Sequence, residues 1–486
     1  MNSPHVSGPL ADAAVVGLGV MGANLARNLA RHGYRVAVYD RLPGKGAALL
    51  ARHNQEGHLL LADSVGDLSA RLTRPRRVLL LVPAGAATDA AIDALTGVLE
   101  PGDILVDCGN AHADDTERRE AALLGRGLHL VGAGVSGGEE GALRGPSIMA
   151  GGTERAWEAV RPLLESVAAR AGTTVCCARV GPGGAGHLAK TVHNGIEYAV
   201  MQVLAETCDL VLRRTDAGHA GLADLLAHWN KGDLESYLVA LTAAAAAHVD
   251  PSTGAPFLNV VDDAADQLGT GRWAARAALD LGVPAEALAQ AVFARFISRD
   301  VEGRAAVRSA VGPLRVTPAQ SGAGPAETDL RDALLVATAV AYAQGLDTIR
   351  AADAACGRVT DLARLTGLWR AGCIIRGRLL ERISDTLAVR PDTPVLLAAE
   401  PLAEIVRDGS AALRRVVLDA VAAGVPVPAL ASVLTHLDQL RTPRLATAMV
   451  QAQRDAMGAH GYRRVDRAGS YHTRWNADGA EIPLDA

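Results

Sequence analysis

Residues 190–198 read KTVHNGIEY, and they combine side chains that transfer protons with side chains that form hydrogen bonds. In a helix, Lys190, His193, Asn194 and Glu197 fall at i, i+3, i+4 and i+7, so all four share one face. A surface helix usually carries Leu, Val or Ala in such a stripe. Burying four polar groups together is unfavourable unless they bond to each other or to a ligand. The segment therefore predicts a catalytic site with a base candidate and an acid candidate, and a solvated polar face is the alternative.

A glycine-rich turn near the N-terminus predicts a second site. An apolar segment that begins at Ala13 runs into GLGVMG at 17–22, and an apolar-periodic segment follows. In a strand–turn–helix unit, the first glycine permits the tight turn, the second lets the backbone approach a pyrophosphate, and the third lets the helix pack on the strand. The sequence thus favours a dinucleotide site over a plain turn. The residues expected to contact the cofactor there are Gly17, Gly19, Val20, Met21 and Gly22.

The choice of nicotinamide cofactor depends on the end of the next predicted strand, at 35–39. Asp40 follows it, about twenty residues past the glycines, where a carboxylate can accept hydrogen bonds from the adenine ribose of NAD. The neighbouring Arg41 could instead bind the 2′-phosphate of NADP, or it could be a surface residue. Because a carboxylate repels a phosphate, the pair favours NAD slightly over NADP.

Further apolar segments at 77–83, 103–110 and 129–134 alternate with helical stretches. This alternation predicts a mostly parallel, doubly wound sheet, in which ligands gather at the carboxyl ends of the strands. The turn at 136–138 can offer N–H groups and a hydroxyl to a carboxylate, or it can be a simple connector. The residues expected at this edge of the sheet are Val82, Pro83, Asn110, Ser136, Gly137 and Gly138.

The composition narrows the class of protein. The chain has 486 residues, which suffices for two or three domains with a large core. A formal net charge of -5 gives no sign of a basic nucleic-acid-binding surface, and no apolar run approaches the roughly 18 residues of a membrane span. Six cysteines are scattered without metal-ligand spacing, and no secretory signal is found in the first residues. These features predict a cytoplasmic protein with no metal site and no membrane or nucleic-acid partner.

After about residue 183 the character of the sequence changes. A glycine-rich break at 182–186 leads into long helical patterns that continue to about residue 440. Past Pro443 a shorter tail ends in a polar segment that we expect to have no core of its own. The predicted organisation is therefore an α/β domain at 1–183, an all-α domain at 184–442 and a C-terminal tail at 443–486.

Taken together, these segments resemble the decarboxylating 6-phosphogluconate dehydrogenases. The resemblance extends from about Val15 to Trp475 and implies a Rossmann-like domain, a large helical domain that binds substrate and forms a homodimer, and a C-terminal tail that enters the partner subunit. The segments that carry it, in the order of the family, are GLGVMG (17–22), CGN (108–110), VSGGEEGAL (135–143), GPSIM (145–149), GAGHLAKTVHNGIEY (184–198), GTGRW (269–273), VFAR (292–295), WRAGCIIR (369–376) and QAQRDAMGAH (451–460).

The resemblance also implies a reaction and residue roles. Lys190 takes the proton of the sugar 3-hydroxyl as hydride leaves C3 for the nicotinamide, and Glu197 protonates C1 of the enediol after CO2 departs; no metal takes part. The implied ligands of the substrate hydroxyls and carboxylate are His193, Asn194, Asn110 and the turn from Ser136 through Gly137 to Gly138. The implied phosphate ligands are Tyr198, Thr270, Arg295 and, from the partner subunit, Arg454 and His460.

The sequence departs from the family at two positions, one expected to bind the substrate phosphate and one expected to bind the cofactor. Leu268 stands where the family has a phosphate-binding lysine, so either the phosphate pocket is weakened or the substrate is a different sugar acid or 3-hydroxy acid. Asp40 stands where NADP-using members commonly have asparagine, which leaves NADP and NAD both open. A non-catalytic homologue is a third possibility, but Lys190, Asn194 and Glu197 are intact and argue against it.

Overall fold

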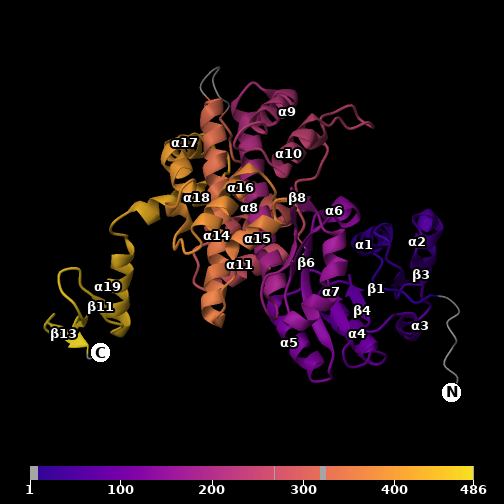
Figure 1. The fold of residues 1–486 in the computed structure, drawn as a ribbon. Helices are drawn as coiled ribbons and strands as arrows, with labels where there is room; N and C mark the ends of the chain where they lie inside the picture. Colours follow the sequence, from indigo (N-terminus) through magenta and orange to yellow (C-terminus); the bar gives the residue numbers. More distant parts are fainter. Residues whose placement is uncertain (1–8, 268, 318–323, 485–486) are drawn as a thin grey trace. The chain divides into compact units, whose positions relative to one another are not determined.

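An eight-stranded sheet forms the N-terminal part of the chain in the computed structural model, which describes residues 9–267, 269–317 and 324–484 (Figure 1). The strand order is β10-β7-β6-β5-β4-β1-β2-β3, and every neighbouring pair is parallel except β6 with β7. The predicted doubly wound, mostly parallel sheet is confirmed. The strands are β1 (Ala13–Val16), β2 (Val36–Tyr39), β3 (Leu59–Leu61), β4 (Arg77–Leu80), β5 (Ile104–Asp107), β6 (His129–Ser136), β7 (Ser147–Ala150) and β10 (Cys177–Arg179).

Burial on both faces explains why these strands are short apolar runs. Successive residues of β1 point to opposite faces: Val15 packs in a cluster with Leu25, and Ala14 packs in a cluster with Ile92. Helices therefore cover both sides of the sheet. They are α1 (Val20–Arg31), α2 (Lys45–His53), α3 (Val65–Ala70), α4 (Ala86–Thr96), α5 (Ala113–Leu124), α6 (Gly138–Arg144) and α7 (Glu154–Val167), and a small hairpin of β8 (Arg170–Ala171) and β9 (Thr174–Val175) follows.

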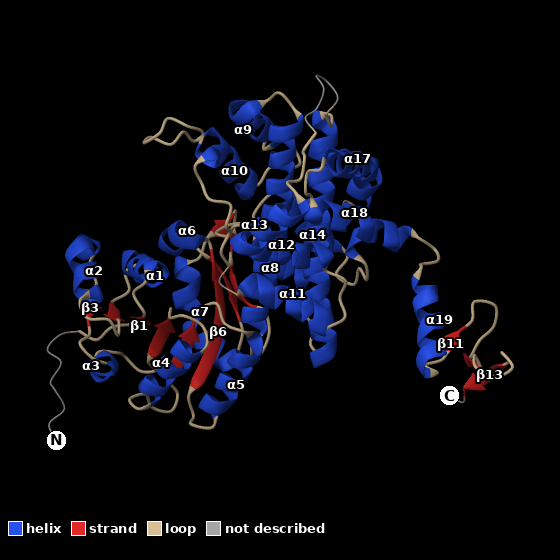
Figure 2. Ribbon diagram, turned by 180° about the vertical axis from the view of Figure 1, so that it is seen from behind, coloured by secondary structure: helices blue, strands red, loops and turns tan. Residues whose placement is uncertain are grey.

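The helical region predicted after residue 183 is confirmed, and two helices of 30 residues dominate it (Figure 2). α8 (Ala185–Arg214) packs against α14 (Glu327–Cys356), and it also packs against β6 and β7. One helix thus contacts both the sheet and the helical region. The other helices here are α9 (Gly218–Trp229), α10 (Tyr237–Ala247), α11 (Thr270–Asp280), α12 (Glu286–Arg299), α13 (Val301–Val311), α15 (Leu362–Leu368), α16 (Arg378–Val389) and α17 (Leu402–Ala423).

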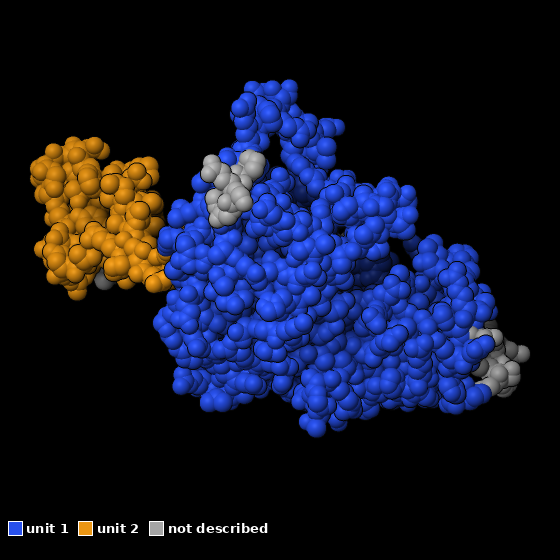
Figure 3. All heavy atoms as spheres, turned by 90° about the horizontal axis from the view of Figure 1, so that it is seen from above, with its two compact units in different colours: residues 1–432 blue, residues 433–486 orange. Residues whose placement is uncertain are grey.

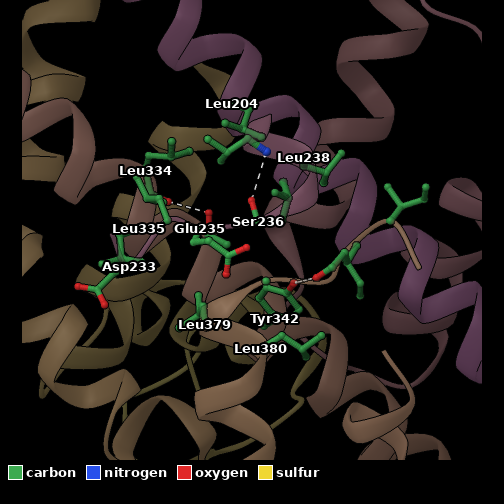
Figure 4. A pocket seen from close by; sticks show the side chains of 17 residues that line it. Leu204, Asp233, Glu235, Ser236, Leu238, Leu334, Leu335, Tyr342, Leu379 and Leu380 are labelled. Carbon is green, nitrogen blue, oxygen red and sulfur yellow. Dashed lines mark hydrogen bonds between the residues drawn. The ribbon is translucent and has the colours of Figure 1, made fainter. Parts of the chain in front are cut away.

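A small apolar cavity of about 30 Å³ lies among α8, α10, α14 and α16 (Figure 4). Val200 and Leu204 of α8 form part of its wall. Two hydroxyls in the wall have partners, since that of Ser236 accepts a hydrogen bond from the N–H of Val239 and that of Tyr342 donates one to a backbone carbonyl. Most of the wall is apolar and the volume is about that of one water molecule, so we treat the cavity as a packing void.

By its internal contacts the chain divides into two units, Met1–Ser432 and Val433–Ala486, which Figure 3 colours separately. Helix α18 (Pro428–Arg441) contains the division between them. The second unit also holds α19 (Thr447–Gly458) and an antiparallel sheet of β11 (Tyr462–Arg463), β12 (Ser470–Thr473) and β13 (Glu481–Leu484). No buried apolar side chain follows Pro443 in the described part of this unit, whereas the carboxylate of Asp455 is fully buried.

None of the helices in the described ranges is both long and apolar enough to cross a membrane. Within the same ranges, no group of three or more His, Cys, Asp or Glu side chains is arranged to hold a metal ion.

Candidate active site

The carboxyl ends of the parallel strands bring most of the predicted cofactor residues to one edge of the sheet. The segments after β1, β2, β4, β5 and β6 all leave the sheet at this edge, because these strands are parallel neighbours. A cavity of about 620 Å³ opens there. The predicted residues that line it are Gly17, Gly19, Val20, Met21, Gly22, Asp40, Arg41, Val82 and Pro83, and Lys45, Leu42 and Ala87 join them.

The glycines of the first turn fit a dinucleotide. Gly17 has φ +94°, and a Cβ there would lie 2.5 Å from the carbonyl oxygen of Leu81. A Cβ on Gly22 would lie 1.9 Å from the carbonyl oxygen of Gly17, so a side chain there would separate helix from turn. Gly19, in contrast, has no atom within 4 Å of the corresponding position, so its backbone is open to a ligand at the N-terminus of α1. The three glycines have the three roles that pyrophosphate binding requires.

Asp40 is more constrained than its sequence position indicates. Its Oδ2 accepts a hydrogen bond from the N–H of Leu18 at 2.7 Å, and its Oδ1 accepts one from the N–H of Leu42 at 2.8 Å. The Lys45 Nζ lies 3.6 Å from Oδ2. The carboxylate thus stabilises the glycine turn through the N–H of Leu18. Its negative charge is compensated by two N–H groups and by the ammonium of Lys45. Arg41 and Lys45 line the same cavity, so two cations stand beside the position expected for the adenine ribose.

The segment predicted to be catalytic lies in α8 (Ala185–Arg214), which packs on the sheet at glycine positions. A Cβ on Gly134 of β6 would lie 2.3 Å from the Cβ of Lys190, and a Cβ on Gly186 would lie 2.3 Å from the carbonyl oxygen of Gly132. The glycines therefore let the helix pack directly on the strand backbone. Lys190 is brought beside the strand that ends at Ser136, and it is 7% exposed.

His193 lies at the centre of a buried hydrogen-bond network. Its Nδ1 is 3.1 Å from Asn194 Oδ1, and its Nε2 is 3.2 Å from Ser136 Oγ, while Asn194 Nδ2 donates to Thr270 Oγ1 at 2.9 Å. An amide oxygen only accepts, so the proton of the neutral imidazole belongs on Nδ1 and Nε2 accepts from Ser136. His193 and Asn194 of the predicted face thus form a network with β6 and α11. The alternative of a solvated face is wrong, because His193 is fully buried and Lys190 is only 7% exposed.

The ionisable groups of this face have displaced pKa values. Burial lowers the pKa of Lys190, against the opposing effect of Glu197 and Cys373. Burial raises the pKa of Glu197, against Lys190 and Arg295. Burial and the nearby Lys190 hold the pKa of His193 well below its usual value, so its 3.7 Å approach to Glu197 Oε2 is not an ion pair. A buried amine and a partly buried carboxyl with opposite shifts are suited to general acid–base chemistry.

A cation lies close to the acid. The guanidinium of Arg295 stacks on the ring of Tyr198, with Cζ 3.5 Å from the ring centroid, and it donates to the carbonyl of Asp266. Tyr198 and Thr270 are buried, and a Cβ on Gly271 would lie 2.3 Å from the Tyr198 ring. Tyr198, Thr270 and Arg295, which were predicted to bind phosphate, therefore surround the start of α11. Leu268 lies outside the described residues.

The turn from Ser136 to Gly138 is held by a segment that sequence reasoning did not assign to the site. Gly137 has φ +115°, and a Cβ there would lie 2.6 Å from the carbonyl oxygen of Gly372. That carbonyl also accepts the N–H of Ser147, beside β6. Trp369 packs edge-on against His193, with ring centroids 5.6 Å apart. Only the WRAGCIIR match hinted at this support, and its role depends on contacts between residues far apart in the chain.

Asp107 and Arg119 support the loop that contains Asn110. Asn110 is exposed at the end of the loop after β5, where the carboxylate of Asp107 accepts the N–H of Gly109 at 3.0 Å. The buried Arg119 lies 3.8 Å from Asp107 Oδ2 and donates to the carbonyl of Gly85 in the neighbouring loop. These buried charged side chains link the loop after β5 to the loop after β4, and no local sequence pattern marks them.

The remaining predicted ligands, Arg454 and His460, lie in the second unit. Arg454 is on the exposed face of α19, and His460 follows the end of that helix.

Comparison with known proteins covers nearly the whole chain. The model of the NAD binding domain of 6-phosphogluconate dehydrogenase matches residues 12–181, and the model of its C-terminal domain matches residues 186–475. The NADP(+)-dependent, decarboxylating 6-phosphogluconate dehydrogenase of Bacillus subtilis is 41% identical over 95% of this chain and 98% of its own length. The decarboxylating enzyme of Synechococcus elongatus is 42% identical over the same shares.

A solved structure agrees with these relatives. The 6-phosphogluconate dehydrogenase of Plasmodium falciparum, described in its apo form and in complexes with NADP+ and with 6-phosphogluconate, superposes with a TM-score of 0.91. It is 32% identical, and the match covers 96% of this chain and all of the other.

Proposed function

Because this chain belongs to the 6-phosphogluconate dehydrogenase family, we propose that it converts 6-phosphogluconate to ribulose 5-phosphate and CO2 while reducing NADP. The observation that carries the proposal is the pairing of Lys190 and Glu197 on one face of α8, with their pKa values shifted towards neutrality from opposite sides. The proposal places the enzyme in the cytoplasm, where the six free cysteines remain reduced.

Lys190 and Glu197 divide the proton transfers between them. Neutral Lys190 removes the proton of the C3 hydroxyl as C3 is oxidised. NADP supplies the acceptor for the C3 hydride. The β-keto acid then loses CO2, because the ketone accepts the electron pair as an enol, and the protonated Lys190 donates to that oxygen. Glu197, kept protonated by burial, gives its proton to C1 of the enediol, and neutral Lys190 takes back the proton of the enol hydroxyl, which restores the ketone.

The hydrogen-bond network orients the substrate. Asn110, Ser136, Gly137, Gly138, His193 and Asn194 contact its hydroxyls and carboxylate in this proposal. The neutral His193 bonds to both Ser136 and Asn194, and Asn194 bonds to Thr270, so these side chains fix one another's orientation. Tyr198, Thr270 and Arg295 bind the phosphate, together with Arg454 and His460 of the partner subunit. The active form is accordingly a homodimer with exchanged tails.

NADP rather than NAD is the cofactor in this proposal. The initial preference for NAD, which rested on Asp40, finds no support in the relatives, since that of Bacillus subtilis is NADP(+)-dependent. Asp40 accepts two backbone N–H groups and lies beside Lys45, so its charge is largely compensated. Arg41 and Lys45 can then hold a 2′-phosphate. Arg41→Ala should raise the KM for NADP about tenfold or more and leave that for NAD nearly unchanged.

Initial rates test the whole assignment. The production of reduced cofactor is measured from 6-phosphogluconate and from gluconate, each with NADP and with NAD. We expect 6-phosphogluconate with NADP to be the best pair. A second candidate, the same chemistry on another sugar acid or 3-hydroxy acid, is favoured only by Leu268. Inactivity towards both acids, with NADP still bound, would overturn the main proposal in favour of that candidate.

A further inference from the structure

The buried carboxylate of Asp455 connects the parts of the second unit. Its Oδ1 accepts the N–H of Gly461 at 3.0 Å and lies 2.8 Å from His472 Nδ1. Its Oδ2 accepts the N–H of Thr473 at 3.0 Å and the indole N–H of Trp475 at 2.8 Å. Burial alone would raise the pKa of Asp455, but these hydrogen bonds outweigh it and lower the pKa to about 2. One charged group thus joins α19 to the turn after it and to β12.

Gln451, one helical turn before Asp455, bonds to the same turn and also to Arg454. It lies four residues before Asp455, so both side chains project from the same face of α19. Its Oε1 accepts from Arg454 Nη1 at 3.1 Å, and its Nε2 donates to the carbonyl of Gly461. Gly461 is therefore bonded through its N–H to Asp455 and through its carbonyl to Gln451.

His460 lies in the turn that these two residues fix. The helix ends at Gly458, and Ala459 adopts φ +49° with its N–H bonded to the carbonyl of Asp455 at 2.9 Å. Gly461, on the other side of His460, has φ +71°. The backbone of His460 is thus fixed on both sides, while the His460 and Arg454 side chains are exposed. The exposed side chains of Arg454 and His460 thus lie on a segment that Asp455 and Gln451 hold by hydrogen bonds.

We propose that Gln451 and Asp455 are positioning residues that hold Arg454 and His460 in a preset arrangement for the phosphate of the substrate. The inference rests on the proposed function, which assigns phosphate binding to that pair. A preset arrangement lowers the conformational entropy that is lost when an anion binds. It also makes phosphate recognition depend on residues that never touch the phosphate.

The test compares substrates with and without phosphate in the full-length protein. Asp455→Asn replaces one acceptor oxygen by an amide with little change of shape, and Gln451→Met removes both contacts of Gln451. Asp466→Asn is the matched control, because Asp466 is an exposed carboxylate of the same unit that pairs with Arg464. The kcat and KM are measured for 6-phosphogluconate and for gluconate.

We expect Asp455→Asn and Gln451→Met to raise the KM for 6-phosphogluconate about 10- to 100-fold, with kcat altered less than about threefold. Gluconate turnover and the control variant should match the wild type. An equal loss on gluconate, or no change in either substrate, would overturn the inference; if Asp455→Asn does not fold, Gln451→Met decides. A wild-type enzyme that does not prefer 6-phosphogluconate over gluconate would instead contradict the proposed function.

Discussion

Lys190 is the residue on which the proposed chemistry depends most directly, since it is the base of the first step. Lys190→Met keeps the length of the side chain and removes the amine. We expect kcat to fall about 10²- to 10⁴-fold, because general base catalysis is lost, while NADP binding and dimer formation remain. Lys231→Met, at an exposed lysine, serves as the control. Stopped-flow measurement of reduced cofactor, with a separate titration of NADP binding, checks the prediction.

The same residue gives the activity a defined pH dependence. Lys190 must be neutral to accept a proton, so kcat should rise with pH through a pKa that burial lowers from its ordinary value of 10.5. Glu197 must be protonated to donate, so kcat should fall at higher pH as the carboxyl, whose pKa burial raises from 4.5, releases its proton. The pH profile of Glu197→Gln should lose the alkaline limb and keep the acid limb. Retention of both limbs would remove Glu197 from its proposed role.

The substitution of Leu268 by lysine tests where the substrate phosphate binds. Restoring the family lysine with Leu268→Lys adds one charge-assisted contact, which is worth about 1.5–3 kcal/mol. The KM for 6-phosphogluconate should fall about tenfold or more, and the kinetics of gluconate should not change. Unchanged kinetics for both acids would mean that the phosphate binds away from residue 268.

At the scale of elements, the cavity beside α8 offers a test of packing. Val200 lines the cavity of about 30 Å³, and Val200→Ile adds one methylene into it. We expect about 0.8 kcal/mol of added stability, from the burial of that group. Val203→Ile, on the same helix at a fully buried position outside the cavity wall, should instead destabilise by about 1–3 kcal/mol. Chemical denaturation of the two variants distinguishes them.

Glu206 connects α8 to α18 and makes that connection sensitive to pH. Its two oxygens accept the N–H groups of Ala429 and Leu430, and burial raises its pKa from 4.5 to about 7. The folded state thus keeps a proton that the unfolded chain releases, so stability should fall as pH rises from about 4.5 to about 7. Glu206→Gln should flatten this dependence, which amounts to about 3 kcal/mol at most. Melting temperatures between pH 5 and pH 8 measure it, with the exposed Glu404→Gln as control.

Sequence patterns predicted the elements whose features are local. Strands buried on both faces give short apolar runs, and the polar face of α8 repeats with the period of the helix, so both were predicted correctly. The short strands of the second unit carry no such run, and they were missed. Trp369, Gly372 and Arg119 were also missed as parts of the site, because their contacts join residues distant in the chain.

At the scale of the whole molecule, tail exchange predicts complementation between two defective chains. One chain carries Lys190→Met, and the other carries Arg454→Ala with His460→Ala. If tails cross between subunits, each mixed dimer has one intact site, built from the Lys190 of one chain and the tail of the other. Equal mixing after dissociation should then restore about a quarter of the wild-type activity, since half of the dimers are mixed. Tails that stay with their own chain would restore none, because every site would then carry a defect.

The unbroken helix α8 also sets how the molecule can move. Its 30 residues span about 45 Å, as a helix rises about 1.5 Å per residue. Its first turns rest on the backbone of β6, and near its other end Arg214 is paired with Asp419 of α17 at 2.8 Å. The helix is thus held near both ends, and the pair proposed to transfer protons, Lys190 and Glu197, lies between these two contacts. We therefore expect the sheet and the helices of the first unit to unfold together, in a single calorimetric transition.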